Sequence, residues 1–477
     1  MTRRGIPLVL AALAWFSCVW FGSWELNPNT AVRLFAAIRI VEDGTATIDP
    51  FAPLTIDKAV FGDHAYLDKA PGMTLTALPA VALADRWTGE RADRFAPLAS
   101  DPGFARYLRV RLRLAVAIGP AVLTALAAAA LYGLALALTG SATAALFAAL
   151  GYALGTPAWG WSTTLLGHAP VAALYVIALW AFERAAVRGR AGAAALGGVA
   201  LGWAVTVEYQ AAIAGTALAL FALWRFRHAP ARWLLAGAAA LGGLAGLAPL
   251  VGYNLFAFGT PFRLGYQGVV GFEGMHQGLF GLTAPNPRVL WEITFGLRRG
   301  LLWVAPVLVL AVPGLFGLAA ARRSRALGIA AAATVAIVLL VNAAYVYWDG
   351  GNATGPRLTI PAVGLLALGL APFWASLRTR QERRLAAGML AVSVLVNATI
   401  AAGDIFTPPW ATSPFAWIWR ERLVTGDITS LGRDLWGWPG WTGPAIWAAV
   451  ALPALLWLTR AARLRDGGPR VRTFMAA

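Results

Sequence analysis

Lysine is confined to one polar stretch of this chain. Lys58 and Lys69 are its only two lysines, and every other basic residue is arginine. Both lie within Asp57–Gly72, beside the acidic residues Asp57 and Asp68. A lysine ammonium is a compact charge with rotatable donors, which suits a phosphate group or a carboxylate. A carboxylate held nearby can remove a proton as a general base. Lys69 and Lys58 are therefore candidates for binding a phosphate or for holding a carboxylate, and Asp68 and Asp57 are candidate bases.

A second candidate site is the glycine-rich segment Tyr345–Arg357. Its glycines allow backbone N–H groups to approach an anion, and the fork of Arg357 can hold a phosphate through two hydrogen bonds. Asp349 lies in the same segment and is a candidate substrate ligand. The alternative is a tight turn in which Asp349 and Arg357 pair with each other.

Glu208 and His168 both lie next to apolar runs. A carboxylate at membrane depth is costly and usually faces a cavity or a partner, so Glu208 is a third candidate base. Alternatively, it caps a turn in water. His168 is either a substrate ligand or a structural residue at the membrane interface.

Tyr66 and Tyr266 are further candidate substrate ligands. Tyr266 lies in a loop rich in aromatic residues and glycines. These aromatic rings could stack on a sugar, or they could form an interfacial belt.

Arginines cluster at Arg106, Arg109, Arg111 and Arg113. One interpretation is that they bind lipid headgroups and neighbouring acids. The other is that they help to receive an anionic lipid carrier, in which case Arg109 contacts its phosphate.

The composition indicates a protein that crosses a membrane many times. Of the 477 residues, 59% are hydrophobic and only 13% are charged, with a mean hydropathy of +0.65. A soluble protein would be about half apolar and about a quarter charged. Because roughly twenty apolar residues cross the hydrocarbon core, we predict about twelve transmembrane helices. The apolar runs are residues 6–24, 112–138, 143–160, 168–183, 191–207, 209–224, 233–257, 300–320, 327–347, 358–376, 385–402 and 441–459.

The net charge of +17 indicates orientation rather than a nucleic-acid partner. If the N-terminus is inside and successive loops alternate between the two sides of the membrane, the loops and tails on the inner side hold twenty arginines and three acidic residues. These residues account for the whole net charge of +17. This distribution satisfies the positive-inside rule. We therefore expect both termini on the cytoplasmic side and the polar chemistry on the outer face of the membrane. We expect membrane lipids as partners, because the chain crosses the membrane many times. We expect no nucleotide, because the sequence has no phosphate-binding glycine loop followed by lysine.

We expect a single integral membrane domain over residues 1–477. Its first periplasmic loop, residues 25–111, should contain two juxtamembrane helices, Asn29–Val41 and Met73–Trp87. Residues 258–299 and 403–441 are predicted to form further periplasmic loops. Counting Met73–Trp87 as a crossing would reverse the charge asymmetry, so we place it in the interface.

Seven short motifs follow one another along nearly the whole chain. They are Arg33-Leu-Phe-Ala with Glu42-Asp-Gly, Tyr66-Leu-Asp-Lys-Ala-Pro-Gly72, Gly155-Thr-Pro with Gly167-His168, Glu208-Tyr209, Tyr253-Asn254 with Phe258-Gly-Thr-Pro-Phe262, Arg299-Gly-Leu, and Trp348-Asp-Gly-Gly with Gly355-Pro-Arg357. In their order and placement they resemble the GT-C class of membrane glycosyltransferases, which use polyprenyl-phosphate sugars. That class includes the protein O-mannosyltransferases of glycosyltransferase family 39 and the lipid A aminoarabinose transferases.

The resemblance implies an all-α polytopic fold with surface helices in a long first periplasmic loop. It also implies that Lys69 contacts the lipid-linked phosphate. The acid before that lysine, here Asp68, joins a histidine at a divalent cation in some members, and which histidine would partner it here is open.

This chain departs from the family at one place. The family's catalytic carboxylate belongs to an Asp-Glu pair ahead of the arginine that matches Arg33, where this chain has Asn27-Pro-Asn-Thr30. Asparagine cannot act as a general base. Another carboxylate therefore takes this role (Asp68, Asp57, Glu208 or Asp349), or Glu25 does, or the activity is altered or lost.

The resulting hypothesis is a glycosyltransferase that moves a monosaccharide, a hexose or a pentose, from a polyprenyl-phosphate carrier to a hydroxyl of a glycan, lipid or protein. The alternative is a flippase for a lipid-linked sugar, which would use the same basic residues without catalysis. A third interpretation is a glycan polymerase or ligase with a pyrophosphate-linked oligosaccharide donor.

Overall fold

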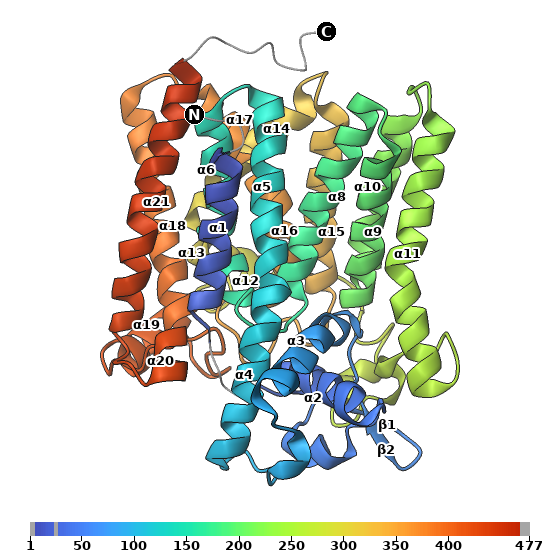
Figure 1. Ribbon diagram of the computed structural model, residues 1–477. Coiled ribbons are helices and arrows are strands. Elements are labelled where there is room, and N and C mark those ends of the chain that lie inside the picture. The colour runs from blue at the N-terminus through green and yellow to red at the C-terminus, as the bar shows by residue number, and fades with distance from the viewer. Residues whose placement is uncertain (1–4, 23–26, 468–477) are drawn as a thin grey trace.

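The computed structural model describes residues 5–22 and 27–467, and this part of the chain is almost entirely helical. Long helices stand side by side above a small lobe of shorter helices and one hairpin (Figure 1). The first and last helices, α1 (Gly5–Trp20) and α21 (Thr442–Gly467), have their terminal ends at the upper end of this view, opposite the lobe. Glu25, one of the candidate bases, lies outside the described residues.

The helices of the bundle occupy the predicted apolar runs. By length and composition, six helices of the described chain can cross a membrane, or seven if the bent pair formed by α16 and α17 is one span. Five shorter apolar helices fill the other predicted runs. The all-α polytopic membrane fold is thus confirmed, whereas twelve crossings remain a prediction. These helices are α5 (Pro120–Thr139), α6 (Ala142–Ala153), α8 (His168–Arg188), α9 (Ala191–Val207), α10 (Ala211–Phe226), α11 (Arg232–Phe258), η5 (Pro306–Leu310), α14 (Ala311–Ala320), α15 (Arg325–Ala343), α16 (Ile360–Ala367), α17 (Leu370–Ser376) and α18 (Arg380–Gly403).

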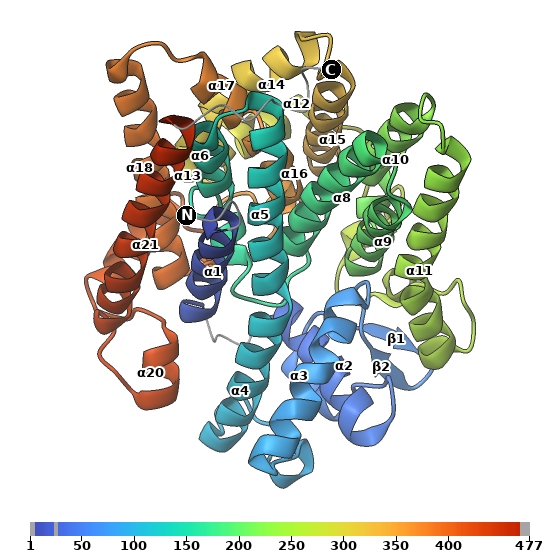
Figure 2. The ribbon, with the colours of Figure 1, turned by 45° about the horizontal axis from the view of Figure 1, so that its top comes forward.

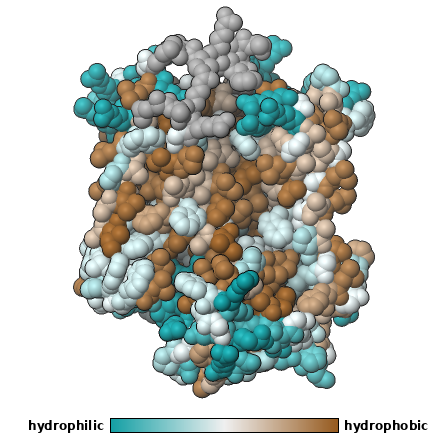
Figure 3. Space-filling view, in the orientation of Figure 1, coloured by the Kyte–Doolittle hydropathy of each residue, from teal (hydrophilic) through white to brown (hydrophobic). Residues whose placement is uncertain are grey.

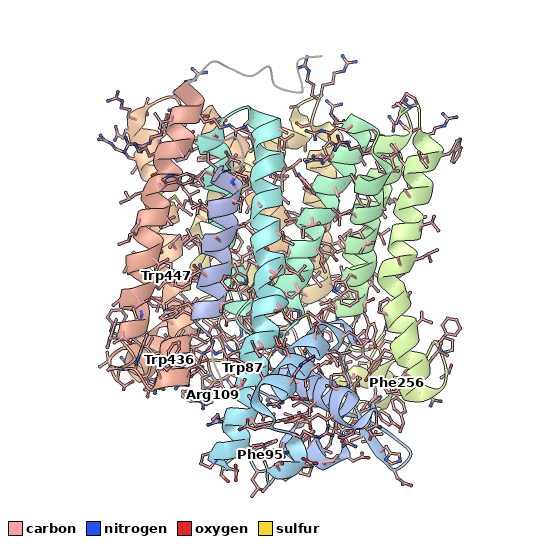
Figure 4. The ribbon with its side chains drawn as sticks, viewed as in Figure 1. Trp87, Phe95, Arg109, Phe256, Trp436 and Trp447 are labelled. Carbon is pink, nitrogen blue, oxygen red and sulfur yellow. The ribbon has the colours of Figure 1, made fainter. Side chains whose placement is uncertain are left out.

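The surface of the molecule is divided into polar ends and an apolar middle. On the face seen in Figure 3, hydrophobic residues cover the middle of the bundle, and hydrophilic residues gather at the upper end and over the lobe. Exposed Trp87, Phe256 and Trp436 lie at a similar height near the lower end (Figure 4). Aromatic side chains favour the boundary between hydrocarbon and water, so this level fits the lower edge of a bilayer.

The lobe is built around α2 (Pro28–Asp43). Asn27 caps this helix by accepting a hydrogen bond from the backbone of Asn29 at 3.1 Å, and Gly44 ends it in the left-handed conformation. Its residues 30–38 are buried, because α3 (Gly72–Thr88) and α4 (Pro102–Ile118) pack against it. Helices therefore form at both predicted places, 29–41 and 73–87, and their position at a membrane surface stays a prediction. The first, however, is a core helix of the lobe rather than a helix that only lies on a membrane.

A short hairpin between the two lysines was not predicted. Strands β1 (Ala59–Phe61) and β2 (His64–Tyr66) pair antiparallel, with Ala59 opposite Tyr66 and Phe61 opposite His64. Gly62, with φ of 60°, allows the two-residue turn between them. Strands of three residues are too short to show a clear alternation of polar and apolar residues.

The arginine cluster lies on a helix rather than in a loop. Helix α4 begins at Pro102, where Asp101 accepts a hydrogen bond from the backbone of Phe104. It continues upward into α5, and the two together form one apolar span (Figure 2). The helix therefore extends beyond the predicted apolar run 112–138 at its N-terminal end, where it packs in the lobe.

Helices α9 and α11 are in backbone contact through glycines. A Cβ added at Gly202 would lie 2.2 Å from the carbonyl oxygen of Gly243, and one at Gly246 would lie 2.6 Å from that of Val199. Small residues at such a seam allow membrane helices to approach closely. This seam fixes the lower end of α9, which leads directly to Glu208.

The remaining elements are short and lie mostly in the loops at the lower end. They are η1 (Asp49–Leu54), η2 (Ala92–Arg94), α7 (Ala158–Trp161), η3 (Gly265–Gly268), η4 (Glu273–His276), α12 (Pro287–Thr294), α13 (Leu301–Val304), η6 (Arg357–Thr359), α19 (Pro414–Ile418), the π-helical turn η7 (Trp419–Leu423) and α20 (Leu431–Trp436).

Candidate active site

A polar cavity of about 310 Å³ lies between the lobe and the lower end of the bundle. Its walls come from the start of α2, the Asp57–Lys69 stretch, the lower ends of α8 and α9, the η3–η4 loop and residues 345–358. Of the residues predicted from the sequence, it brings together Asp57, Asp68, Lys69, His168, Glu208, Tyr266, Asp349 and Arg357.

The Lys69 ammonium lies between two carboxylates. Its Nζ is 3.5 Å from Oδ2 of Asp57 and donates a hydrogen bond to Asp68. Burial raises the pKa of the Asp68 carboxyl, although Lys69 opposes this shift. Burial also disfavours the ammonium, but Asp68 and Asp57 together raise the pKa of Lys69. The lysine therefore stays charged at neutral pH. The second oxygen of Asp68, Oδ1, is buried without a hydrogen-bond partner in the described chain.

Glu208 follows the last turn of α9 and forms an ion pair with Arg33. The distance from Arg33 Nη2 to Glu208 Oε1 is 2.9 Å, and the Arg33 side chain is only 1% exposed. The pair requires glycine at position 167, since a Cβ there would lie 2.3 Å from the same carboxylate oxygen. Burial raises the pKa of Glu208, while the positive charges of Arg33, Lys69 and Arg357 oppose the shift.

Arg357 is the cation best placed to receive an anion. Its guanidinium rests on Gly350, where a Cβ would come within 2.7 Å of Nε. No ion pair joins it to a carboxylate within residues 5–22 and 27–467, and its buried Nε has no hydrogen-bond partner there. Asp349 pairs instead with Arg298, at 2.6 Å. The alternative in which Asp349 and Arg357 neutralise each other is therefore wrong.

Buried Arg299 holds the glycine-rich segment in place. It donates hydrogen bonds to the carbonyl oxygens of Asp349 at 2.8 Å, Gly351 at 2.6 Å and Ala353 at 2.5 Å. An arginine that satisfies three backbone carbonyls in a loop fixes the path of that loop. Gly350 and Gly351 can follow this path because both have positive φ.

The loop after α11 closes the cavity over the Asp57–Gly72 stretch. A Cβ at Gly265 would lie 2.6 Å from the carbonyl oxygen of Leu67, so this loop touches the backbone beside Asp68. Tyr266 follows and packs edge-on against Tyr209, with ring centroids 5.1 Å apart. His168, the first residue of α8, lies on the opposite wall beside Glu208.

An apolar groove of about 750 Å³ adjoins the cavity. Its lining includes Trp303, Val304 and a row on α18 formed by Val392, Val396 and Ile400. The two spaces share the segment 349–357 as a wall, because Gly350, Gly351 and Arg357 line the cavity whereas Thr354 and Gly355 line the groove. A charged head and a long apolar tail on one molecule would fit this arrangement.

Three predicted site residues lie outside the cavity lining. Lys58 donates a hydrogen bond to the carbonyl oxygen of Ala52 at 2.8 Å. Tyr66 packs against Phe258, with ring centroids 5.3 Å apart. Arg109 lies on α4 and donates to the carbonyl oxygen of Asp434 at 3.3 Å (Figure 4).

The other arginines of the α4 cluster are paired with acids. Arg106 pairs with Glu90 at 2.9 Å, Arg111 pairs with Asp85, and Arg113 pairs with Asp434. The cluster thus joins α4 to the lobe and to the last loop. This arrangement favours the interpretation in which these arginines bind neighbouring acids.

The cavity also contains residues that were not named as site residues from the sequence. They are Asn27, Asn29, Arg33, Gln210, Tyr345 and Tyr347. Arg33 belongs to one of the seven motifs, and this membership was the signal that could have identified it as a site residue. Asn27 and Asn29 stand where the family has its acidic pair, so that place faces the cavity here with amides instead of carboxylates.

The lining does not form an evident metal site. Asp68 and His168 both face the cavity, but no group of three histidine, cysteine, aspartate or glutamate side chains comes together among the described residues. Asp68 is also engaged by Lys69. The divalent cation considered from the sequence therefore stays a prediction.

Comparisons with known proteins agree with this architecture. Residues 105–253 match the family model of dolichyl-phosphate-mannose-protein mannosyltransferases. The solved structure of ArnT from Cupriavidus metallidurans, bound to undecaprenyl phosphate, is similar to this chain with a TM-score of 0.50 at 14% sequence identity. The match covers 97% of this chain and 72% of ArnT. This chain has the GT-C fold.

A second solved structure of the GT-C class also matches. It is the archaeal oligosaccharyltransferase AglB from Archaeoglobus fulgidus, in complex with an inhibitory peptide and a dolichol-phosphate. The identity is 12%, the TM-score is 0.45, and the match covers 86% of this chain and 57% of AglB. No curated protein sequence matches this chain. The GT-C fold that the seven motifs implied is confirmed by the match to ArnT.

Proposed function

We propose that this protein transfers a monosaccharide from a polyprenyl-phosphate carrier to an acceptor hydroxyl. One observation carries the proposal: a cavity with Lys69 and Arg357 in its lining shares a wall with an apolar groove. The phosphate of the donor would lie between the two cations, and its polyprenyl chain would follow the groove. The sugar, whether a hexose or a pentose, would face Asp57, Asp68 and Glu208.

The chemistry needs one base and a stabilised leaving group. The acceptor oxygen attacks the anomeric carbon while a carboxylate takes its proton. The bond from this carbon to the phosphate oxygen breaks, and the polyprenyl phosphate leaves with the electron pair. Lys69 and Arg357 stabilise the negative charge that gathers on the phosphate. A single displacement inverts the configuration at the anomeric carbon.

The polar cavity supports an active site at the end of the molecule opposite the termini. We propose that this end is periplasmic and that both termini are cytoplasmic. Arginines assigned to the inner segments lie at the upper ends of helices, with Arg188 at the end of α8, Arg232 at the start of α11 and Arg380 at the start of α18 (Figure 1). This distribution supports the orientation through the positive-inside rule.

A transfer assay with purified protein in vesicles tests the function. The donor is a polyprenyl-phosphate monosaccharide labelled on the sugar, and the acceptor is a membrane extract of hydroxyl-bearing lipids and glycans. Label that moves to a new molecule, in the wild type but not in Asp68→Asn, supports the transferase. Label that only changes leaflet identifies a flippase. The asparagines at positions 27 and 29 favour this alternative, because an amide cannot act as a general base. Label that does neither refutes both functions.

A further inference from the structure

A second large cavity lies at the upper end of the bundle, remote from the candidate active site. Its volume is about 740 Å³, and α1, α5, α8, α10, α21 and the turn before α15 contribute to its walls. Nothing in the proposed transfer reaction uses it, because the donor and the base lie at the lower end.

Arginine dominates the polar part of this upper cavity. Its lining includes Arg184, Arg188, Arg225, Arg323 and Arg465. Among the described residues, Glu183 is the only acid in the lining, and Arg225 engages it through two hydrogen bonds of 2.9 Å and 3.0 Å. The cavity therefore carries a large positive excess and attracts an anion.

Two of these arginines have no carboxylate partner in the part of the chain that the structure describes. Arg184 lies over the ring of Trp180, at 5.2 Å from its centroid, and makes no ion pair there. Arg465, on the last turns of α21, makes none either, whereas the adjacent Asp466 is bound to the start of α6 through Ser141 and Thr143. Both guanidinium groups can therefore engage a ligand.

A buried hydroxyl provides an independent sign of a ligand. Tyr132 of α5 lines the same cavity and is only 2% exposed, and its hydroxyl lies close to Arg465 without forming a hydrogen bond of regular geometry in the described chain. Leaving a buried hydroxyl without a partner is unfavourable. A phosphate oxygen in the cavity would accept this hydrogen bond.

The other half of the upper cavity is apolar. Leu134, Leu136 and Leu138 of α5 and Val187 of α8 belong to its lining. Below the hydrophilic upper rim, the side of the bundle is hydrophobic (Figure 3). An amphiphile could thus place its headgroup among the arginines and its chains along α5, whereas a soluble anion would leave the apolar wall uncovered.

We propose that the upper cavity binds an anionic phospholipid of the adjacent leaflet. Its phosphate contacts Arg184 and Arg465 and accepts a hydrogen bond from Tyr132, and its acyl chains pack on α5. Basic pockets between membrane helices are known to hold such headgroups. This site does not depend on the proposed transferase function, since it lies at the other end of the bundle.

Lipid binding to the purified, delipidated full-length protein tests the proposal. Phosphatidylglycerol is titrated, and bound lipid is counted by native mass spectrometry while the melting temperature is followed. We expect the wild type to retain phosphatidylglycerol and to be stabilised by it. The double variant Arg184→Gln/Arg465→Gln should bind at least about tenfold more weakly, as expected when two charged hydrogen bonds are lost.

The control removes the same charge outside the cavity. Arg190 and Arg463 are exposed residues at the same end and do not line the cavity. The variant Arg190→Gln/Arg463→Gln should bind phosphatidylglycerol as the wild type does. An equal loss in both double variants would mean that only the general charge matters, and it would overturn the site.

Two further measurements keep the proposal testable if the arginine variant does not fold. Tyr132→Phe keeps all charges and should weaken phosphatidylglycerol binding severalfold. Unchanged binding would mean that the phosphate does not contact Tyr132, and it would overturn the site in this cavity. Phosphatidylcholine should not replace phosphatidylglycerol. If phosphatidylcholine binds equally well, or if inorganic phosphate gives the same stabilisation, the site is not one for anionic phospholipid.

Discussion

Arg33 and Glu208, separated by 175 positions in the sequence, form a 2.9 Å ion pair in the wall of the polar cavity. The arginine comes from the buried helix of the lobe, and the glutamate follows a helix of the bundle. The pair therefore joins the two parts of the molecule at the place where the substrate would bind.

Removing Glu208 should destabilise the protein. Glu208→Ala leaves the buried Arg33 guanidinium without its counter-charge, for which we expect a cost of about 3–5 kcal/mol. Glu208→Gln keeps an acceptor, so its cost should be about 1–3 kcal/mol. Thermal denaturation in detergent measures both, with the exposed Glu421→Ala as a control that should change little. If neither variant lowers the melting temperature more than Glu421→Ala does, the ion pair contributes nothing to stability.

The raised pKa of Glu208 predicts how stability depends on pH. Because burial raises this pKa in the folded protein above its unfolded value, the folded state binds the proton more tightly. The contribution of this group to stability is therefore fully present below the unfolded pKa of about 4.3, and it is lost as pH rises through the folded pKa. Glu208→Gln should flatten this part of the stability profile. Parallel wild-type and variant profiles would contradict the assignment.

The two lysines should differ in their effect on transfer. Lys69 lies in the cavity, whereas Lys58 donates to a backbone carbonyl outside its lining. Lys69→Met should lower kcat/KM for the lipid donor by about 10²–10³-fold, the size expected for one lost electrostatic contact to a developing charge. Lys58→Met should retain transfer. Comparable losses in both variants would show that the ammonium position is irrelevant.

Neighbouring glycines offer a matched test of the Arg357 position. Gly350 and Gly351 both have positive φ, of 71° and 64°, so alanine strains the backbone similarly at either site. Only the Cβ at position 350 meets Arg357, at 2.7 Å from Nε, and position 351 has open space. Gly350→Ala should therefore raise KM for the donor by about tenfold, as for a weakened charged hydrogen bond, whereas Gly351→Ala should not. Equal KM values would place the phosphate elsewhere.

The apolar groove should accept the polyprenyl chain. Val396 lines it, whereas its neighbour Leu395 is exposed on the same helix and does not. Val396→Trp should fill the groove and raise KM for a long-chain donor by about tenfold or more, since each buried CH₂ contributes about 0.8 kcal/mol. A short-chain donor should be used equally by Val396→Trp, Leu395→Trp and the wild type. A chain-length preference that survives Val396→Trp would count against the groove.

The sequence predicted the bundle well and the lobe only in part. Long apolar runs produce membrane helices wherever they occur, because backbone groups in hydrocarbon must be satisfied within the helix. The run 191–207 coincides with α9 for this reason. The hairpin between Lys58 and Lys69 has no long apolar run that would predict it. The two lysines on either side of it have different partners, a backbone carbonyl for Lys58 and the Asp68 carboxylate for Lys69.

The candidate site was predicted where local chemistry identifies a residue. Lys69 and Arg357 stand out by residue type and by their glycine-rich or acidic neighbours, and both line the cavity. Arg33 and its partner could not be paired from the sequence, because nothing local relates positions 33 and 208. The partner of Asp349 was also missed, since Arg298 reaches it from another loop.

The segment from Asp349 to Arg357 separates two compartments. The cavity on one side is lined by charged residues, and the groove on the other side is lined mainly by aliphatic and aromatic residues. Three of the segment's backbone carbonyls accept hydrogen bonds from Arg299, so its backbone has little freedom to move. A change that reshapes one compartment will therefore displace the other, so preferences for the carrier's head and for its tail should evolve together rather than one at a time.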